Sequence, residues 1–253
     1  MINDPYDVLA SVYDSFMDNS DETIESTAVL IAEVKDRYVS GPRPVAADLG
    51  CGTGRILPVL AKTGFEILAI DRSERMLQAS MMRMADEGAN DAKVLYIQQD
   101  LTTLDLGGSI DAMFCLLDTV NHLTDPADAG LFFRSCFSEL KDGGVLVFDA
   151  LRLRYMMEEL GQEIYYDVDQ EHALLWANNF DPDAQLNTAS LTYFYEYAQD
   201  SYRREDAVVA ERYYSPEQLT QWLKEAGFTL IEIDTIPLGR EAEDRRHLFI
   251  AQK

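Results

Sequence analysis

The chain is short of basic residues, and this limits the partners that it can bind. Lys and Arg together number 21 against 45 Asp and Glu, a formal net charge of −24. Proteins that bind DNA or RNA neutralise phosphates with Lys and Arg, and no basic stripe offers this, so we expect no nucleic-acid partner. A cationic or neutral small molecule suits the negative field better. The same acidity also has the plain role of keeping a protein soluble.

Cysteines and long apolar runs are scarce as well. Cys51, Cys115 and Cys136 are odd in number and stand in apolar or motif contexts, which indicates reduced thiols rather than a disulfide framework. No window approaches the roughly 18 apolar residues of a membrane span. Residues 1–5 lack the basic and apolar regions of a secretion signal. We therefore expect a cytoplasmic protein with no membrane partner.

The most informative stretch is residues 45–55, Val-Ala-Ala-Asp-Leu-Gly-Cys-Gly-Thr-Gly-Arg. It predicts a buried strand that runs into a glycine-rich turn and then a helix. Glycine permits positive φ in such a turn, and its missing Cβ lets a ligand approach the backbone. Open α/β sheets build ligand pockets in this way at the carboxyl ends of their strands.

The spacing of the glycines distinguishes between ligands. A dinucleotide fingerprint, G-x-G-x-x-G, needs its third glycine at position 55, where the chain has Arg55. The chain instead has G-x-G-x-G preceded by Asp48. This resembles motif I of the class I S-adenosylmethionine (SAM) dependent methyltransferases, D/E-x-G-x-G-x-G, at each defined position. The resemblance implies SAM as the cofactor, and contacts to it from Asp48, Gly50, Cys51, Gly52 and Gly54.

Two further acids follow at the ends of predicted strands. Asp71 ends the strand over residues 65–71 and lies 21 residues after Gly50. An acid about 20 residues on binds the ribose hydroxyls, because a carboxylate only accepts hydrogen bonds. Any single Asp is as readily a helix cap or a loop residue, but three acids at successive strand ends make that reading much weaker. By resemblance, Asp100 accepts from the adenine amino group, and the cofactor contacts include Leu101 and Arg72.

The fourth predicted strand, residues 110–116, ends beside the motif I turn at the topological switch point. The loop after it resembles the corresponding segment of glycine N-methyltransferase and its relatives. The resemblance places Leu116 on the cofactor side, Asp118 at a substrate-side asparagine position and His122 at a histidine position. Asp in place of Asn suits an amine acceptor and repels a carboxylate.

Methyl transfer from a sulfonium is an in-line displacement in which the protein mainly supplies alignment. A base is needed only where the nucleophile loses a proton, and it must reach that proton in a pocket pose. Asp118 and His122 are the candidate catalytic residues. A structural role in the loop is the commoner one for a lone histidine, so this alternative stays open.

Residues 5–17 predict an amphipathic helix, and a second helix follows over 21–39. The first contains a Y-D-x-x-A-x-x-Y-D-like pattern. It resembles the N-terminal helix that small-molecule methyltransferases fold over their cofactor. The resemblance implies that Tyr13 forms a wall of the methyl-donor pocket; an aromatic that only packs the helix is the alternative.

Strands and helices then alternate, which predicts a parallel sheet covered by helices on both faces. The chain ends with a helix and a hairpin, so the last strand should be antiparallel. The resemblance implies an α/β fold, a Rossmann-like three-layer α/β/α sandwich whose seven-stranded sheet has the order 3-2-1-4-5-7-6. The remaining predicted elements are helices at 55–62, 73–87, 127–140 and 215–226, a turn at 141–144, and strands at 145–150, 228–235 and 247–252.

We divide the chain into N-terminal capping helices (1–40), a SAM-binding core (41–150), an insertion (151–214) and a C-terminal part that completes the core (215–253). The insertion is rich in aromatic residues and has a turn at Asp181-Pro182-Asp183 between two β-like runs. It predicts a small antiparallel sheet over the carboxyl ends of the strands, acting as a substrate lid or as a homodimer surface. Its aromatic rings either cradle a cationic substrate or only pack a sheet face.

The sequence therefore predicts a SAM-dependent methyltransferase that acts on nitrogen or oxygen of a small molecule, without a metal site. Two alternatives remain. A SAM-binding sensor without turnover would carry the same binding motifs. An NAD-dependent oxidoreductase is disfavoured by the missing third glycine, and it leaves the N-terminal helices unexplained.

Overall fold

The protein is built on a seven-stranded, mostly parallel sheet. The computed structural model describes residues 5–10, 13–16, 21–89, 91–162, 164–168, 172–199, 201–236 and 244–253. The strands of this sheet are β1 (Val45–Leu49), β2 (Glu66–Asp71), β3 (Val94–Gln98), β4 (Ile110–Cys115), β5 (Leu140–Leu151), β10 (Leu230–Ile233) and β11 (Arg246–Gln252). Their order is β10-β11-β5-β4-β1-β2-β3, and β11 runs antiparallel to β5. The predicted sheet order and the antiparallel last strand are confirmed.

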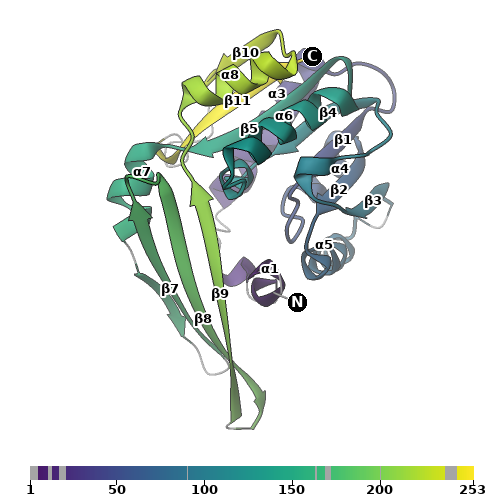
Figure 1. Cartoon of the computed structure of the whole chain (residues 1–253). Helices are drawn as coiled ribbons and strands as arrows, with labels where there is room; N and C mark the ends of the chain where they lie inside the picture. The colour runs from purple at the N-terminus through teal and green to yellow at the C-terminus, as the bar shows by residue number, and fades with distance from the viewer. Residues whose placement is uncertain are drawn as a thin grey trace.

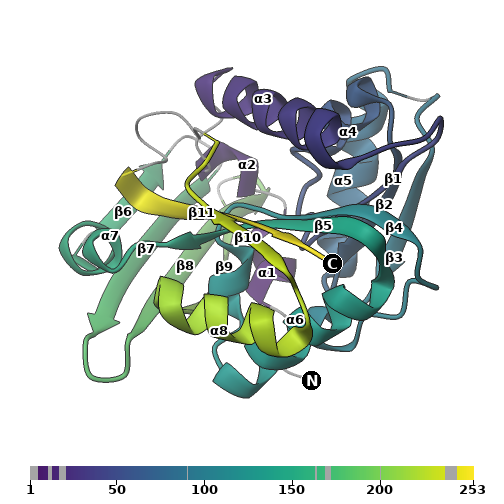
Figure 2. The same ribbon diagram turned by 90° about the horizontal axis from the view of Figure 1, so that it is seen from above.

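Helices cover both faces of this sheet, as Figures 1 and 2 show. Alternate strand residues point to opposite faces, so Ala46 and Val147 pack into one apolar core and Ala47 and Phe148 into the other. The first core is closed by α3 (Asp21–Tyr38), α4 (Leu57–Thr63) and α5 (Glu74–Asp86). The second is closed by α6 (Pro126–Glu139) and α8 (Pro216–Ala226). The predicted three-layer sandwich is therefore confirmed.

Two local predictions differ from the structure. The turn predicted at 141–144 is wrong, because these residues belong to β5 and form an irregular stretch of it. Their hydrogen bonds join the end of the chain: Gly143 N–H donates to the Lys253 carbonyl at 3.1 Å, and Lys253 N–H to the Gly144 carbonyl at 2.9 Å. In place of one helix over 5–17, the structure has α1 (Pro5–Leu9) and α2 (Tyr13–Phe16). Residues 11, 12 and 17 lie outside the described residues.

A second sheet follows β5, after the short helix α7 (Leu153–Glu158) and a 3-10 turn. It is antiparallel, with the order β6-β7-β8-β9. The predicted turn at Asp181-Pro182-Asp183 connects its second and third strands. The strands are β6 (Ile164–Val168), β7 (His172–Asp181), β8 (Leu186–Ala198) and β9 (Ser201–Arg212).

This antiparallel sheet projects from the body of the protein, and α1 lies between it and α5 (Figure 1). A third apolar cluster joins the three: Tyr193 and Val209 of the sheet pack with Leu9 of α1 and Met76 of α5. Some of the aromatic side chains of the insertion thus have a packing role. Within the described ranges, no helix has the length and apolar character that a membrane span requires.

Candidate active site

The site begins at the glycine-rich turn after β1. The Gly50 and Cys51 N–H groups both donate to the Ile70 carbonyl, at 2.8 and 2.9 Å, and the Gly52 N–H donates to Asp71 Oδ2 at 2.9 Å. These bonds fold the turn back onto the carboxyl end of β2. The local sequence therefore fixes the turn beside the first acid that follows it.

The three glycines of the turn have positive φ and different surroundings. A Cβ on Gly50 would lie 2.5 Å from Thr119 Cγ2, and one on Gly54 would lie 2.7 Å from the Ser80 side chain in α5. A Cβ on Gly52 would meet nothing within 4 Å. Gly50 and Gly54 thus permit close packing, while Gly52 has open space beside its backbone.

Two adjoining cavities surround this turn. The larger, about 700 Å³, includes Tyr13, Gly50, Gly52, Asp71, Arg72, Asp100, Leu101 and His122 in its wall. The smaller, about 390 Å³, is lined by residues that include Tyr13, Asp48, Gly50, Cys51, Gly52 and Leu116. The structure therefore brings most of the predicted site residues together. Gly54 and Asp118 are not among the lining residues of either cavity.

Asp48 is a buried acid in the wall of the smaller cavity. It is 3% exposed, and its Oδ2 has no hydrogen-bond partner among the described residues. Burial, together with the charge of Asp71, raises the pKa of Asp48 well above its ordinary value. Buried polar atoms nearly always have a partner, so this oxygen is suited to a donor or cation that arrives with a ligand.

Asp71, which ends β2, and Asp100, which follows β3, line the larger cavity. Asp71 Oδ1 accepts from the Ser73 N–H at 2.9 Å, while Oδ2 accepts from the Gly52 N–H. A carboxylate oxygen can accept more than one hydrogen bond. Asp100 Oδ1 accepts from the N–H and hydroxyl of Thr102, at 2.8 and 2.6 Å. Asp100 therefore caps a 3-10 turn, η1 (Leu101–Thr103), in addition to lining the cavity.

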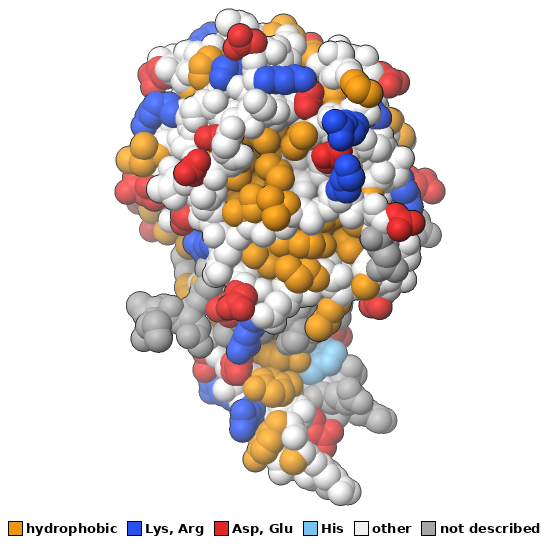
Figure 3. Space-filling view, turned by 90° about the vertical axis from the view of Figure 1, so that its right-hand side faces the viewer, with side chains coloured by type: hydrophobic (Ala, Val, Ile, Leu, Met, Phe, Trp, Pro, Cys, Tyr) orange, Lys and Arg blue, Asp and Glu red, His pale blue; other side chains and the backbone are white. Residues whose placement is uncertain are grey.

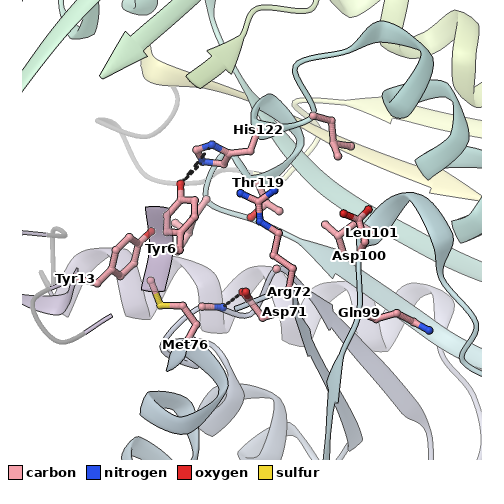
Figure 4. Close-up of a pocket in the computed structure, with 14 residues that line it drawn as sticks. Tyr6, Tyr13, Asp71, Arg72, Met76, Gln99, Asp100, Leu101, Thr119 and His122 are labelled. Carbon is pink, nitrogen blue, oxygen red and sulfur yellow. Dashed lines mark hydrogen bonds between the residues drawn. The ribbon is translucent and has the colours of Figure 1, made fainter. Parts of the chain in front are cut away.

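Two aspartates, one in each N-terminal helix, bind these helices to the residues around the cavities. Asp7 Oδ1 accepts from the Ser73 hydroxyl at 2.6 Å. Asp14 Oδ1 accepts from the Thr53 hydroxyl at 2.7 Å, and its Oδ2 pairs with Arg83 Nη2 of α5 at 2.6 Å. These bonds hold Tyr6 and Tyr13, which lie in the larger cavity's wall (Figure 4). Tyr6 belongs to the sequence pattern that predicted Tyr13, but its place in the wall was not predicted.

His122 ends η2 (Thr119–His122), the turn that follows β4, and faces Tyr6. The Tyr6 hydroxyl lies 2.9 Å from His122 Nε2, and the two rings meet edge to face (Figure 4). Glu211 of β9 approaches the same nitrogen, with Oε1 at 3.8 Å. The antiparallel sheet therefore contributes a carboxyl group beside the cavity. Sequence reasoning missed Glu211, because no motif marks it.

Glu211 is 7% exposed, and its Oε2 accepts from Asn187 Nδ2 at 3.2 Å. Burial and the nearby Asp118 carboxylate raise the pKa of Glu211 to about 8. Asp118 itself adopts a φ of 57°, and its carboxylate accepts from Arg246 Nη2 at 2.9 Å. Asp118 thus lies in a charged network behind His122 instead of in the cavity wall.

Asp149, at 3% exposure, completes this network. Its two carboxylate oxygens accept from the N–H groups of Leu117 and Asp118, at 2.9 and 2.6 Å. Burial raises the pKa of Asp149 to about 6, and the Arg246 guanidinium opposes the rise. These bonds fix the loop that carries Asp118 and His122.

Known proteins resemble this chain in sequence and in architecture. Residues 46–144 match the model of a methyltransferase domain family. A protein of Geobacillus sp. (strain WCH70) named as a methyltransferase is 31% identical over 209 residues, which is 81% of this chain and 83% of that protein. Glycine N-methyltransferase of Rattus norvegicus is a distant likeness, 26% identical over 136 residues, 48% of this chain and 46% of that protein.

Solved structures share this fold. An S-adenosylmethionine-dependent methyltransferase from Clostridium acetobutylicum ATCC 824 superposes with a TM-score of 0.79 at 24% identity, covering 98% of this chain and 99% of that one. The sugar N-methyltransferase KedS8 from Streptoalloteichus sp ATCC 53650 gives 0.74 at 23% identity, covering 96% and 92%. With the motif I turn and its cavities, these likenesses lead to one conclusion. The chain belongs to the class I SAM-dependent methyltransferases.

Proposed function

We propose that this enzyme methylates a small molecule, at nitrogen or oxygen, in the cavity between the β1 turn, η2 and α1. The observation that carries the proposal is that Tyr6 and Tyr13, from the N-terminal helices, line the larger cavity. A cavity narrowed by these two rings suits a small acceptor better than a polymer. KedS8, whose name gives a sugar as its substrate, supports the same substrate class.

We propose that SAM occupies both cavities. The unpartnered oxygen of Asp48 fits the cationic methionyl part in the smaller cavity, next to Gly50, Cys51, Gly52 and Leu116. In the larger cavity, Asp71 would accept from the ribose hydroxyls, with Arg72 beside it. The adenine would lie against Asp100 and Leu101, with Tyr13 in the wall shared by both parts. Gly54 would act through its packing on α5. When bound, SAM supplies an activated methyl group.

On the acceptor side we propose that His122, which lines the larger cavity, takes a proton from the acceptor where one must be lost. Asp118 remains a candidate for this side of the site. Because its carboxylate is paired with Arg246, we assign it a charge effect on the acceptor instead of proton transfer.

Two further proposals concern the whole chain. The three cysteines are all free and buried, which supports a cytoplasmic location. Ile164, Tyr166 and Val168 alternate along β6 on one face of the antiparallel sheet, and all three are exposed. This apolar edge supports a homodimer formed through the insertion.

Incubation with methyl-labelled SAM and a panel of amino sugars, simple amines and phenols tests the function. We expect a labelled product from at least one of them. D71A should weaken SAM binding at least tenfold by calorimetry, about 1.4 kcal/mol, whereas H122A should lower turnover more than SAM affinity. D105A, at an exposed position after β3, is the control. Tight SAM binding without product across the panel would favour a sensor, and unchanged affinity in D71A would remove Asp71 from the site.

A further inference from the structure

The acceptor side of the cavity holds a polar cluster assembled from separate parts of the chain. Tyr6 comes from α1, His122 from η2 and Glu211 from β9. The His122 Nε2 atom lies 2.9 Å from the Tyr6 hydroxyl and 3.8 Å from Glu211 Oε1. The antiparallel sheet supplies the Glu211 carboxyl group that approaches His122. The insertion therefore adds chemistry to the cavity as well as apolar packing.

Burial of Glu211 and of the amide that contacts it lowers the stability of the fold, which a purely structural role would not explain. Asn187, fully buried, donates through Nδ2 to Glu211 Oε2 and to Asn178 Oδ1, at 3.2 and 3.0 Å. Its own Oδ1 has no partner among the described residues. Burying a carboxyl group and an incompletely bonded amide destabilises a fold unless something compensates. Such groups gather where a protein binds or transforms a ligand.

The charges around Glu211 favour one kind of acceptor. Asp118, Asp149 and Glu211 are three acids on this side. The guanidinium of Arg246 is 2.9 Å from Asp118 and 4.0 Å from Asp149. An oxyanion formed from a phenol or an alcohol would be disfavoured by Asp149 and by the ionised form of Glu211, because Arg246 offsets only one of the three acids. A protonated amine would be attracted, most strongly in this weakly hydrated setting.

We infer that the acceptor is an amine and that Glu211 is the positioning residue that prepares His122 to take its proton. The inference rests on the proposed function and narrows it to nitrogen. The acceptor arrives as an ammonium ion and releases one proton to a ring nitrogen of His122. Its freed lone pair forms a bond to the methyl carbon as the carbon–sulfur bond breaks. The products are a methylated ammonium ion and the neutral thioether, and Glu211 stabilises the imidazolium.

The pairing of His122 with Glu211 can be tested without an acceptor. The chain contains only three histidines, His122, His172 and His247, so their ring signals can be told apart. We would follow their ring signals by NMR against pH in wild-type protein saturated with S-adenosylhomocysteine, and identify His122 with H122Q. The titratable and charged groups around this cluster are Tyr6 of α1, Tyr13 of α2, Arg55 after β1, Arg72 after β2, Asp118 before η2, Asp149 of β5, Tyr155 of α7, Glu211 of β9, Arg245 before β11 and Arg246 of β11.

Because burial raises the pKa of Glu211 to about 8, the His122 signal should shift in a step near that pH. The step should vanish in E211Q and persist in E205Q, a matched change on the same strand, where Glu205 accepts from the Tyr195 hydroxyl. A His122 titration that is identical in wild type and E211Q would overturn the inference. If E211Q does not fold, Y6F, which removes the hydroxyl that lies 2.9 Å from His122 Nε2, should move the same step.

Turnover gives the second test. Matched probes of one skeleton, glucosamine against glucose and benzylamine against benzyl alcohol, should be methylated on nitrogen only. With an amine that the wild-type enzyme methylates, E211Q should lower kcat at least tenfold and leave SAM affinity, measured by calorimetry, unchanged. E205Q should behave as wild type. Methylation of the alcohols alone, or full turnover by E211Q, would contradict the inference. If no probe is methylated, the small-molecule proposal loses support, and the His122 titration still decides the role of Glu211.

Discussion

At the scale of single residues, Asp48 is the clearest case of a group that destabilises the free protein. Its carboxyl group is buried, lacks a partner on Oδ2 and faces the charge of Asp71. The pKa in the folded chain is raised, so folded protein holds the proton more readily than unfolded protein does. The contribution to stability is full below the ordinary pKa of an aspartate and is lost as pH rises through the raised value.

We predict that D48N is more stable than wild type without ligand at neutral pH, and that its melting temperature depends less on pH. An uncharged amide avoids the penalty of burying a carboxylate. SAM, whose cationic groups we place next to this oxygen, should stabilise the variant less, by about 1.4 kcal/mol for each tenfold loss of affinity. Thermal unfolding from pH 5 to 8, with and without SAM, measures both effects. D105N is the control, and an equal gain from SAM in D48N and wild type would contradict this placement.

At the scale of elements, α1 and α2 are too short to be stable helices by themselves. Their position depends on tertiary contacts: Asp7 on Ser73, Asp14 on Thr53 and Arg83, and Leu9 in the apolar cluster of the antiparallel sheet. Since Tyr6 and Tyr13 of these helices lie in the larger cavity's wall, opening of these contacts would widen the way out for a bound ligand. The Asp14 contacts should therefore control ligand release.

We predict that D14N releases SAM at least several times faster than wild type and changes the melting temperature little. The variant loses the charge that pairs with Arg83, but the core beneath it is unchanged. A chase of bound, labelled SAM with excess unlabelled SAM measures the dissociation rate. D86N, at an exposed position in α5, is the matched control. Equal release rates in D14N and D86N would show that the Asp14 contacts do not control release of SAM.

The elements also show which features the sequence could predict. The β1 turn and the acid that ends β2 are marked by short sequence patterns, and each lies where it was predicted. The bulged start of β5 was mistaken for a turn, because its partner, Lys253, lies far from it in the sequence. Glu211 could not be found for the same reason, since it meets His122 only when the antiparallel sheet lies beside η2. Local patterns predict local geometry, and contacts between distant segments leave no such pattern.

At the scale of the whole molecule, the excess of acid is spread over the surface. On the face shown in Figure 3, acidic and basic side chains are scattered around a central group of hydrophobic ones. Many of the ion pairs are exposed, such as that between Arg154 and Glu158, and pairs of this kind contribute little to stability. Folding brings 45 acids and 21 bases close together, so self-repulsion should outweigh these pairs.

We therefore predict that potassium chloride stabilises the protein. The screening length falls from about 30 Å at 0.01 M to about 10 Å at 0.1 M, which weakens repulsion across the whole surface more than attraction within a contacting pair. A gain of about 1 kcal/mol would raise the melting temperature by roughly 2–4 °C in a chain of this size. The same salt should raise KM for an amine acceptor and leave kcat nearly unchanged, because the approach of a cation is steered by the net field and the reaction occurs inside the cavity. Thermal unfolding from 10 to 200 mM salt measures the change in melting temperature. Turnover of an amine substrate over the same range measures the change in KM. A melting temperature that falls with salt would mean that the ion pairs, and not the net charge of −24, dominate the electrostatics of folding.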